Sequence, residues 1–113
     1  MDINAPFISV ALPLHNGARY LEASIKSILD QSFKDWELIV FDAASTDSTP
    51  EVLAALWLKY PILQTRGKII RSSIKDNVPK SLNAAFAQAK GRYFTWTSDD
   101  NNYLPGAFEK IVS

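Results

Sequence analysis

The sequence predicts a single α/β domain in which helices cover both faces of a mostly parallel sheet. Short apolar runs that are typical of strands alternate with helical patterns along the whole chain. The predicted order is β-α-β-α-β-α-β-α, and this alternation implies right-handed crossovers between parallel strands. The length of 113 residues fits one such domain with one hydrophobic core.

The first strand and helix are predicted at residues 7–14 and 18–31. The run FISVALPL at 7–14 is almost wholly apolar, which is typical of a strand buried on both faces. Pro13 lacks an N–H donor, so we expect pairing to stop there. Asn16 is the expected N-cap of the helix, and the short loop before it places N–H groups where they suit an anion. The apolar stripe of this helix consists of Leu21, Ile25, Ile28 and Leu29.

The middle of the chain repeats this pattern. Residues 36–41 (WELIVF) predict a second buried strand, which ends at Asp42. A turn rich in Ser and Thr follows, and Thr49 with Pro50 predicts the start of a helix that ends before Pro61. Residues 68–72 predict a short third strand.

The last third of the chain predicts one more helix, one more strand and a terminal helix. The helix covers residues 79–90, and Gly91 is expected in a left-handed conformation just after it. The strand covers residues 93–97 (YFTWT), whose β-branched and aromatic side chains favour a sheet. The terminal helix is expected from Pro105. All three tryptophans, Trp36, Trp57 and Trp96, are expected in the core.

Composition excludes several classes of protein. Lys and Arg equal Asp and Glu at 12 each, so no overall charge attracts nucleic acid or an anionic membrane. The absence of cysteine excludes disulfides, zinc–thiolate sites and thiol catalysis. No apolar run reaches the ~18 residues of a membrane span, and the N-terminus has no signal-peptide pattern. We expect a cytoplasmic location. A full-length protein that contains this chain could also lie at the inner face of the membrane.

Asp99 and Asp100 directly follow the last predicted strand. The carboxyl ends of parallel strands gather at one edge of a sheet, where α/β proteins bind ligands. That edge would also collect His15 and Asp42. Two neighbouring carboxylates repel each other, and a divalent cation relieves the repulsion. The alternative is a plain polar turn before the helix at Pro105, since Asp and Asn are common turn residues.

Two long segments resemble the family 2 glycosyltransferases, which have the GT-A fold. They are ISVALPLHNGARYLEASIKSILDQSFKDWELIVFDAASTDST and AKGRYFTWTSDDNNYLPGAFEKIV, and the resemblance covers residues 8–112. Four elements agree in order: the strand end PLHN, the helix end QSF, the loop from Asp42 to Asp47, and SDD at 98–100. The resemblance implies an inverting enzyme of polysaccharide biosynthesis, which transfers a sugar from a nucleotide-diphospho-sugar to an acceptor hydroxyl with Mg²⁺ or Mn²⁺.

The resemblance also implies roles for residues near the nucleoside. Pro13, His15 and Asn16 would lie beside the base, with His15 where the family usually has Tyr. Asp42 would begin the base pocket. Ala43 stands where the family has a second acid, and the following Ala44 where it has Gly, so the donor base stays open.

For the diphosphate and metal, the resemblance implies three further residues. Asp99 is similar to the acid that approaches the ribose, and Asp100 to the acid that ligates the metal. Lys80 lies in the region where the family places a basic group. The usual general base lies beyond the acidic pair, and only 13 residues follow Asp100. We therefore identify no catalytic residue and expect a nucleotide-sugar-binding part truncated after this motif, with a glycan or lipid-linked acceptor bound by the longer protein.

Each candidate also has a structural interpretation. His15 could be a solvated loop residue, and Asp42 could cap the turn that follows it. Asp47 is expected to start a helix rather than bind a ligand. Lys80 and Asn83 could lie on the solvated face of their helix.

Two other functions remain open beside a glycosyltransferase part. A receiver-type phosphoacceptor module has the same fold class, but it needs acids after its first strand, where this chain has Leu14, His15 and Asn16. A non-catalytic nucleotide-sugar-binding module is compatible with Ala43. The site decides among these, because a fold alone does not determine function.

Overall fold

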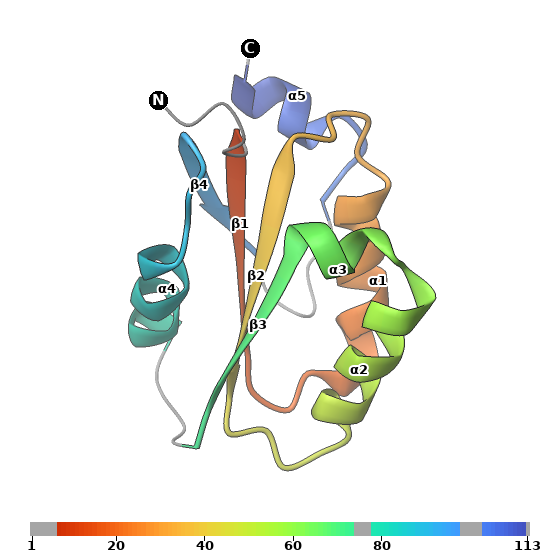
Figure 1. The fold of residues 1–113 in the computed structure, drawn as a ribbon, viewed down its shortest axis with the longest axis vertical. Helices are drawn as coiled ribbons and strands as arrows, with labels where there is room; N and C mark the ends of the chain where they lie inside the picture. The colour runs from red at the N-terminus through yellow and green to blue at the C-terminus, as the bar shows by residue number, and fades with distance from the viewer. Residues whose placement is uncertain (1–6, 74–77, 98–102, 113) are drawn as a thin grey trace.

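The computed structural model describes residues 7–73, 78–97 and 103–112, which build a parallel sheet flanked by helices (Figure 1). Neighbouring strands in the sheet follow the order β3-β2-β1-β4. This architecture confirms the predicted α/β class. The elements are β1 (Ile8–Leu14), α1 (Ala18–Leu29), β2 (Trp36–Ala43), α2 (Thr49–Lys59), α3 (Ile62–Arg66), β3 (Gly67–Ser72), α4 (Val78–Ala87), β4 (Tyr93–Trp96) and α5 (Ala107–Val112).

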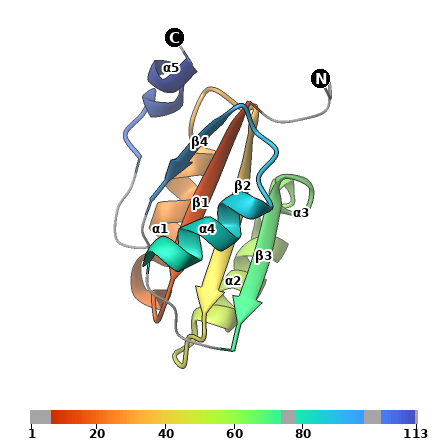
Figure 2. The ribbon, with the colours of Figure 1, turned by 90° about the vertical axis from the view of Figure 1, so that its left-hand side faces the viewer.

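Helices cover both faces of the sheet, as the alternation predicts. Figure 1 shows α1, α2 and α3 on one side of the strands and α4 on the other, and Figure 2 shows α4 lying across β1 and β2. Every residue of β1 and β2 is buried, because each face packs against a helix. Val10 and Leu12 join the larger core beneath α1 and α2, whereas Ala11 joins a smaller core beneath α4.

The two ends of the strands form two different edges of the sheet. We name the edge where β1 and β2 begin the amino edge, and the edge where they end the carboxyl edge. α5 lies near the amino edge (Figure 1), and Gln31, which follows α1, hydrogen-bonds both α1 and α5. Gln31 Nε2 donates to the C=O of Leu104 at 2.8 Å, and its Oε1 accepts from the N–H of Phe108 at 3.1 Å.

Strand pairing continues past Pro13 on one side only. β1 pairs with β2 as far as Leu14 opposite Asp42, so the prediction that pairing stops at Pro13 is wrong for this neighbour. Pairing with β4 ends at Ala11 opposite Trp96. The C=O of Ala11 points toward the β4 side, where it accepts from the N–H of Thr97. Pro13 lies two residues after Ala11, so its backbone faces the β4 side as well. The missing donor of Pro13 therefore affects the β4 side alone.

Three other predictions differ from the structure. Pro61 ends α2 but is also the N-cap of α3, a five-residue helix that the sequence did not predict. Gly106, with φ 78°, is the one described glycine in the left-handed region, so Gly91 is not. Trp96 is 50% exposed on the edge strand β4, whereas Trp36 is buried as expected.

Within the described ranges, no helix is both long and apolar enough to cross a membrane.

Candidate functional site

The strand order places the expected binding edge between β1 and β4. The chain builds β1, β2 and β3 outward in one direction and then returns to add β4 on the other side of β1. Such a reversal is the topological switch point of a doubly wound sheet, and ligands bind outside the carboxyl ends of the strands at this point. The loop after β1 borders this switch point, and the loop after β2, which is hydrogen-bonded to it, completes the candidate site at the carboxyl edge.

The side chain of Asn16 joins these two loops. Its Oδ1 accepts hydrogen bonds from the N–H groups of Thr46 at 2.7 Å and Asp47 at 3.2 Å. The N–H of Asn16 donates to Ser45 Oγ at 2.9 Å. Asn16 has φ 56°, a left-handed conformation that Asn tolerates better than most residues. The loops after β1 and β2 are thus one hydrogen-bonded unit.

This unit already occupies the N-terminus of α1. The N–H of Gly17 donates to Thr49 Oγ1 at 3.0 Å, and the N–H of Ala18 donates to Asp47 Oδ2 at 3.4 Å. The N-cap residue is Gly17. The prediction that Asn16 caps this helix is therefore wrong, whereas its N-terminus does face an anionic group, as expected. The carboxylate of Asp47 already fills that role.

Asp47 also accepts hydrogen bonds from the first residue of α2, which agrees with the predicted role at a helix start. Its Oδ1 accepts from the N–H of Thr49 at 2.9 Å and from Thr49 Oγ1 at 2.5 Å. The side-chain hydrogen bond from Thr49 is the largest cause that lowers the pKa of Asp47, and the backbone N–H donors of Thr49 and Ala18 lower it further. With these donors in place, Asp47 is a structural residue of the site rather than a ligand-binding one.

His15 is held by the backbone of the second loop. Its Nδ1 lies 2.6 Å from the C=O of Ala43. A carbonyl oxygen can only accept, so Nδ1 carries the proton in this contact. In the neutral ring Nε2 is then an acceptor, and Asn16 Nδ2 lies 3.4 Å from it. These contacts fix the orientation of the half-buried ring, so His15 is not a freely solvated side chain.

Asp42 has one carboxylate oxygen without a hydrogen bond among the described residues. Asp42 is fully buried, and its Oδ1 accepts from the N–H of Ser45 at 3.2 Å. Oδ2 has no hydrogen-bond partner there, and Arg71 Nε lies 3.7 Å away. A buried carboxylate oxygen that lacks a donor is costly, because burial removes the water that would otherwise solvate it. Asp42 therefore caps its turn through Oδ1 and leaves Oδ2 with Arg71 as its one charged neighbour among the described residues.

Ala43 and Ala44 show what the departure from the family pattern does locally. The side chain of Ala43 is buried in the smaller core beneath α4, while its C=O holds His15. Ala44 has φ 54°, the left-handed region that favours glycine. The family's glycine would fit this conformation without strain, and Ala44 adopts it with a Cβ.

The remaining predicted residues lie apart from this cluster or outside the described residues. Pro13 is buried within β1, one residue before its end. Lys80 is exposed in the first turn of α4, on the other face of the sheet. Asp99 and Asp100 lie outside the described residues. Among the residues that the structure does describe, no three His, Asp or Glu side chains gather as a metal site.

Three residues of the site were not predicted. Ser45 and Thr49 accept hydrogen bonds from the loop after β1, and Arg71 lies beside Asp42. Arg71 stands opposite Asp42 in the β2–β3 register. The register of two strands 29 residues apart depends on the whole sheet, so the sequence offered no local signal for this pair.

Comparisons with known proteins agree on one family. A family model described as glycosyl transferase family 2 matches residues 9–113. The chain is 36% identical over 110 residues to the putative glycosyltransferase EpsE of Bacillus subtilis (strain 168), covering 97% of this chain and 38% of the relative. It is 30% identical over 105 residues to the putative teichuronic acid biosynthesis glycosyltransferase TuaG of the same organism, covering 93% of this chain and 40% of that relative. The chain thus spans well under half the length of these relatives.

Solved structures share the fold. The mannosyltransferase PcManGT from Pyrobaculum calidifontis, in complex with GDP-Man and Mn²⁺, matches 96% of this chain and 32% of its own length, with a TM-score of 0.87 and 24% identity. S. aureus TarS 1-349, in complex with UDP-GlcNAc, matches 94% of this chain and 30% of its own length, with a TM-score of 0.82 and 23% identity. At these identities the likeness concerns the fold.

Proposed function

The chain belongs to glycosyl transferase family 2, and we propose that it forms the part of such an enzyme that binds the nucleoside diphosphate of a sugar donor. The observation that carries this proposal is Asp42. Its buried Oδ2 lacks a hydrogen bond among the described residues and lies at the carboxyl edge, beside the switch point of the sheet. An N–H or O–H of a nucleoside would supply the donor that this oxygen lacks.

Different residues of the site would bind different parts of the sugar donor. His15 lies beside Asp42's loop with its ring fixed by Ala43, so it can pack against a base without losing rotamer freedom on binding. Asp99 and Asp100, which follow β4 in the sequence, would face the ribose and the metal. A cation such as Mg²⁺ needs only one or two protein carboxylates when substrate phosphates supply other oxygens.

The chemistry that such a cation supplies when bound is neutralisation of the charge on the departing nucleoside diphosphate. The chain's own contribution is to hold and orient the donor. In a full-length enzyme of this family, a carboxylate base would take the proton of an acceptor hydroxyl on a glycan or a lipid-linked sugar. This donor class is supported by the two structural neighbours, which were solved with GDP-Man and with UDP-GlcNAc.

Base selectivity should be weak. Ala43 offers no side-chain acceptor for an N–H of the base, and its side chain is 2% exposed in the core beneath α4. A site discriminates strongly only where its polar groups pair with those of the ligand. We therefore expect UDP, GDP, CDP and dTDP to bind with affinities within about tenfold of each other, a spread of about 1.4 kcal/mol.

Calorimetric titration of these four diphosphates, with and without Mn²⁺, tests the proposal. Binding should require or be strengthened by Mn²⁺. Asp42→Asn should weaken binding by roughly tenfold, because it removes a charge-assisted hydrogen bond. Asp100→Asn should abolish the effect of Mn²⁺.

The matched control is Asp30→Asn, which removes an exposed carboxylate at the far end of α1 and should leave affinity unchanged. The absence of binding by any diphosphate would overturn the proposed function. An unchanged Mn²⁺ effect in Asp100→Asn would remove that residue as the metal ligand.

A further inference from the structure

A cavity opens at the amino edge, at the opposite ends of β2 and β3 from the candidate site. It has a volume of about 610 Å³, within the range of small-molecule sites. We name it the amino-edge pocket. Its walls come from the start of β2, from α3 and the start of β3, and from the segment after α4; the residues used below are Asp35, Trp36, Glu37, Arg66, Lys68 and Lys90.

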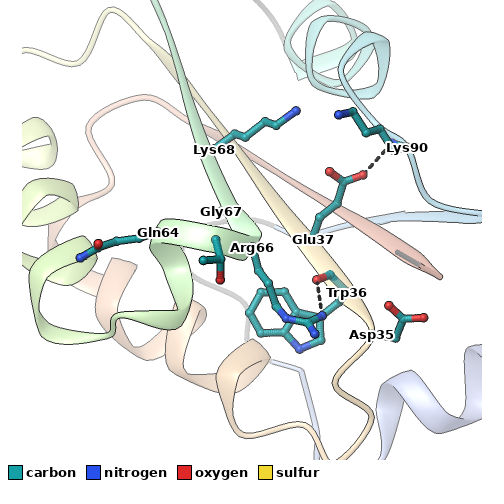
Figure 3. A pocket seen from close by; sticks show the side chains of 9 residues that line it. Asp35, Trp36, Glu37, Gln64, Arg66, Gly67, Lys68 and Lys90 are labelled. Atoms are coloured by element: carbon teal, nitrogen blue, oxygen red, sulfur yellow. Dashed lines mark hydrogen bonds between the residues drawn. The ribbon is translucent and has the colours of Figure 1, made fainter. Parts of the chain in front are cut away.

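Two lysines of this pocket lack an anionic partner. Figure 3 shows the side chains of Lys68 and Lys90 pointing toward one another above Glu37. Neither ammonium group has a hydrogen bond or an ion pair within 4 Å in the described part of the chain. Like charges that face each other repel, so this arrangement favours an anion between them.

The nearby carboxylate of Glu37 is already engaged. Its Oε2 accepts from Ser9 Oγ at 2.5 Å and from the backbone N–H of Lys90 at 2.6 Å. Ser9 in turn accepts from the N–H of Gly91 at 2.8 Å. These bonds fasten Glu37 as part of the wall, and its single negative charge offsets one of the two lysines.

Arg66 adds a third cation on the other side of the pocket. Its Nη1 donates to the C=O groups of Lys34 and Trp36, which fixes the guanidinium beside the start of β2. A guanidinium has five N–H donors, so donors remain for a ligand. The pocket is lined by three cationic side chains, Arg66, Lys68 and Lys90, and by two carboxylates, Asp35 and Glu37. Its net charge is therefore +1.

We propose that the amino-edge pocket binds a phosphate group, either as inorganic phosphate or on a small phosphorylated molecule such as a sugar phosphate. Lys68 and Lys90 contact the phosphate oxygens from two sides, and Arg66 contacts the far end of the ligand. The pocket is larger than a phosphate ion, which leaves room for an attached sugar. This site lies at the other end of the strands from the proposed donor site and does not depend on it.

The test follows amide and indole N–H signals by NMR during titration with inorganic phosphate and with glucose 1-phosphate. The signals of Lys90, Gly67 and the Trp36 indole should shift, and those of Asn16 and Ser45 at the carboxyl edge should not. Glucose 1-phosphate binding more tightly would identify a phosphorylated small molecule as the ligand, and equal affinities would identify the phosphate group alone. Absence of saturable shifts with both probes would overturn the proposal.

Variants give the sign of the electrostatic effect. Lys68→Gln should weaken phosphate binding at least fivefold, while Lys26→Gln, an equal charge change on exposed α1, should leave it unchanged. Asp35→Asn removes a negative charge from the rim and should strengthen binding two- to fivefold. Equal weakening by Lys68→Gln and Lys26→Gln would show attraction by general charge only and would overturn the proposal.

Discussion

Asp47 stabilises the starts of two helices with one carboxylate. Its Oδ1 accepts from Thr49 in α2, and its Oδ2 accepts from Ala18 in α1. Negative charge at a helix N-terminus is favourable, because the unpaired N–H groups there carry partial positive charge. The two loops that surround Asp42 therefore depend on this residue for their shape.

The stability that Asp47 contributes should depend on pH. Its pKa is lowered from the ordinary value of 3.8 in the folded protein, so its contribution is complete above that value and is lost as the pH falls through the lowered pKa. Asp47→Asn should melt at a lower temperature than the parent chain at pH 7. The two melting temperatures should converge once the pH falls below the lowered pKa of Asp47. Thermal melts that differ equally at all pH values would contradict this role.

Ala44 adopts a conformation that suits glycine. With φ 54°, its Cβ crowds the backbone, and glycine removes this strain. We expect Ala44→Gly to raise the free energy of unfolding by about 0.5–1 kcal/mol, since relief of strain exceeds the extra entropy of the unfolded chain. Ala54→Gly, in the exposed middle of α2, is the control and should lower it by about 1 kcal/mol. Urea unfolding measures both, and a loss in both variants would refute the interpretation.

Residue roles at the site were only partly predictable. Asp47 as a helix start followed from local turn chemistry, which extends over three or four residues. Asn16 was predicted to cap its own helix, but its side chain instead bonds Thr46 and Asp47, 30 residues away. The pairing of Arg71 with Asp42 depends on strand register in the same way. Such long-range hydrogen bonds leave no pattern in the local sequence.

Among the elements, the strands and longer helices followed from hydrophobic patterning, and the exceptions have physical reasons. α3 has five residues, too few to show a helical period. Trp96 of β4 was expected in the core, yet Phe94 and Trp96 are about half exposed. Burial of a strand depends on its place in the sheet, and β4 occupies an edge of the described sheet.

Gly91 shows how an element junction constrains the sequence. A Cβ at this position would lie 2.5 Å from Ser9 Oγ and 2.7 Å from Ser9 N, too close for real atoms. The segment after α4 passes this near to β1 because Gly91 N–H bonds Ser9. Gly91→Ala should lower the free energy of unfolding by about 1–3 kcal/mol through overpacking. Urea unfolding tests this, and an unchanged midpoint would show that β1 can move away at no cost.

At the scale of the whole molecule, the two edges of the sheet have separate chemistry. The carboxyl edge carries Asp42, His15 and the loops joined by Asn16, and the amino edge carries the amino-edge pocket with Arg66, Lys68 and Lys90. β2 has 8 residues and so separates the edges by roughly 25 Å. Ligands at the two edges therefore have no direct contact, and each site can be tested alone.

The chain as given should bind a sugar donor without transferring the sugar. A general base must lie within about 3 Å of the proton it removes. Among the described carboxylates near the carboxyl edge, Asp42 is assigned to the nucleoside and Asp47 is committed to two helix starts. Glu109 is on α5, near the amino edge. Incubation with nucleotide sugars and acceptor glycans should give slow hydrolysis only, and transfer well above hydrolysis would reveal a base in this chain.

The most direct measurement of the central claim is paramagnetic broadening of NMR signals by Mn²⁺ in the presence of UDP or GDP. A metal-bound diphosphate at the carboxyl edge should broaden the amide signals of Gly17, Ser45 and Thr97. The amides of Asp35, Gly67 and Lys90 at the amino edge should keep their intensity, and Mg²⁺ in place of Mn²⁺ should broaden none. Broadening confined to the amino edge, or none that depends on the nucleotide, would contradict a donor site at the carboxyl ends of β1 and β2.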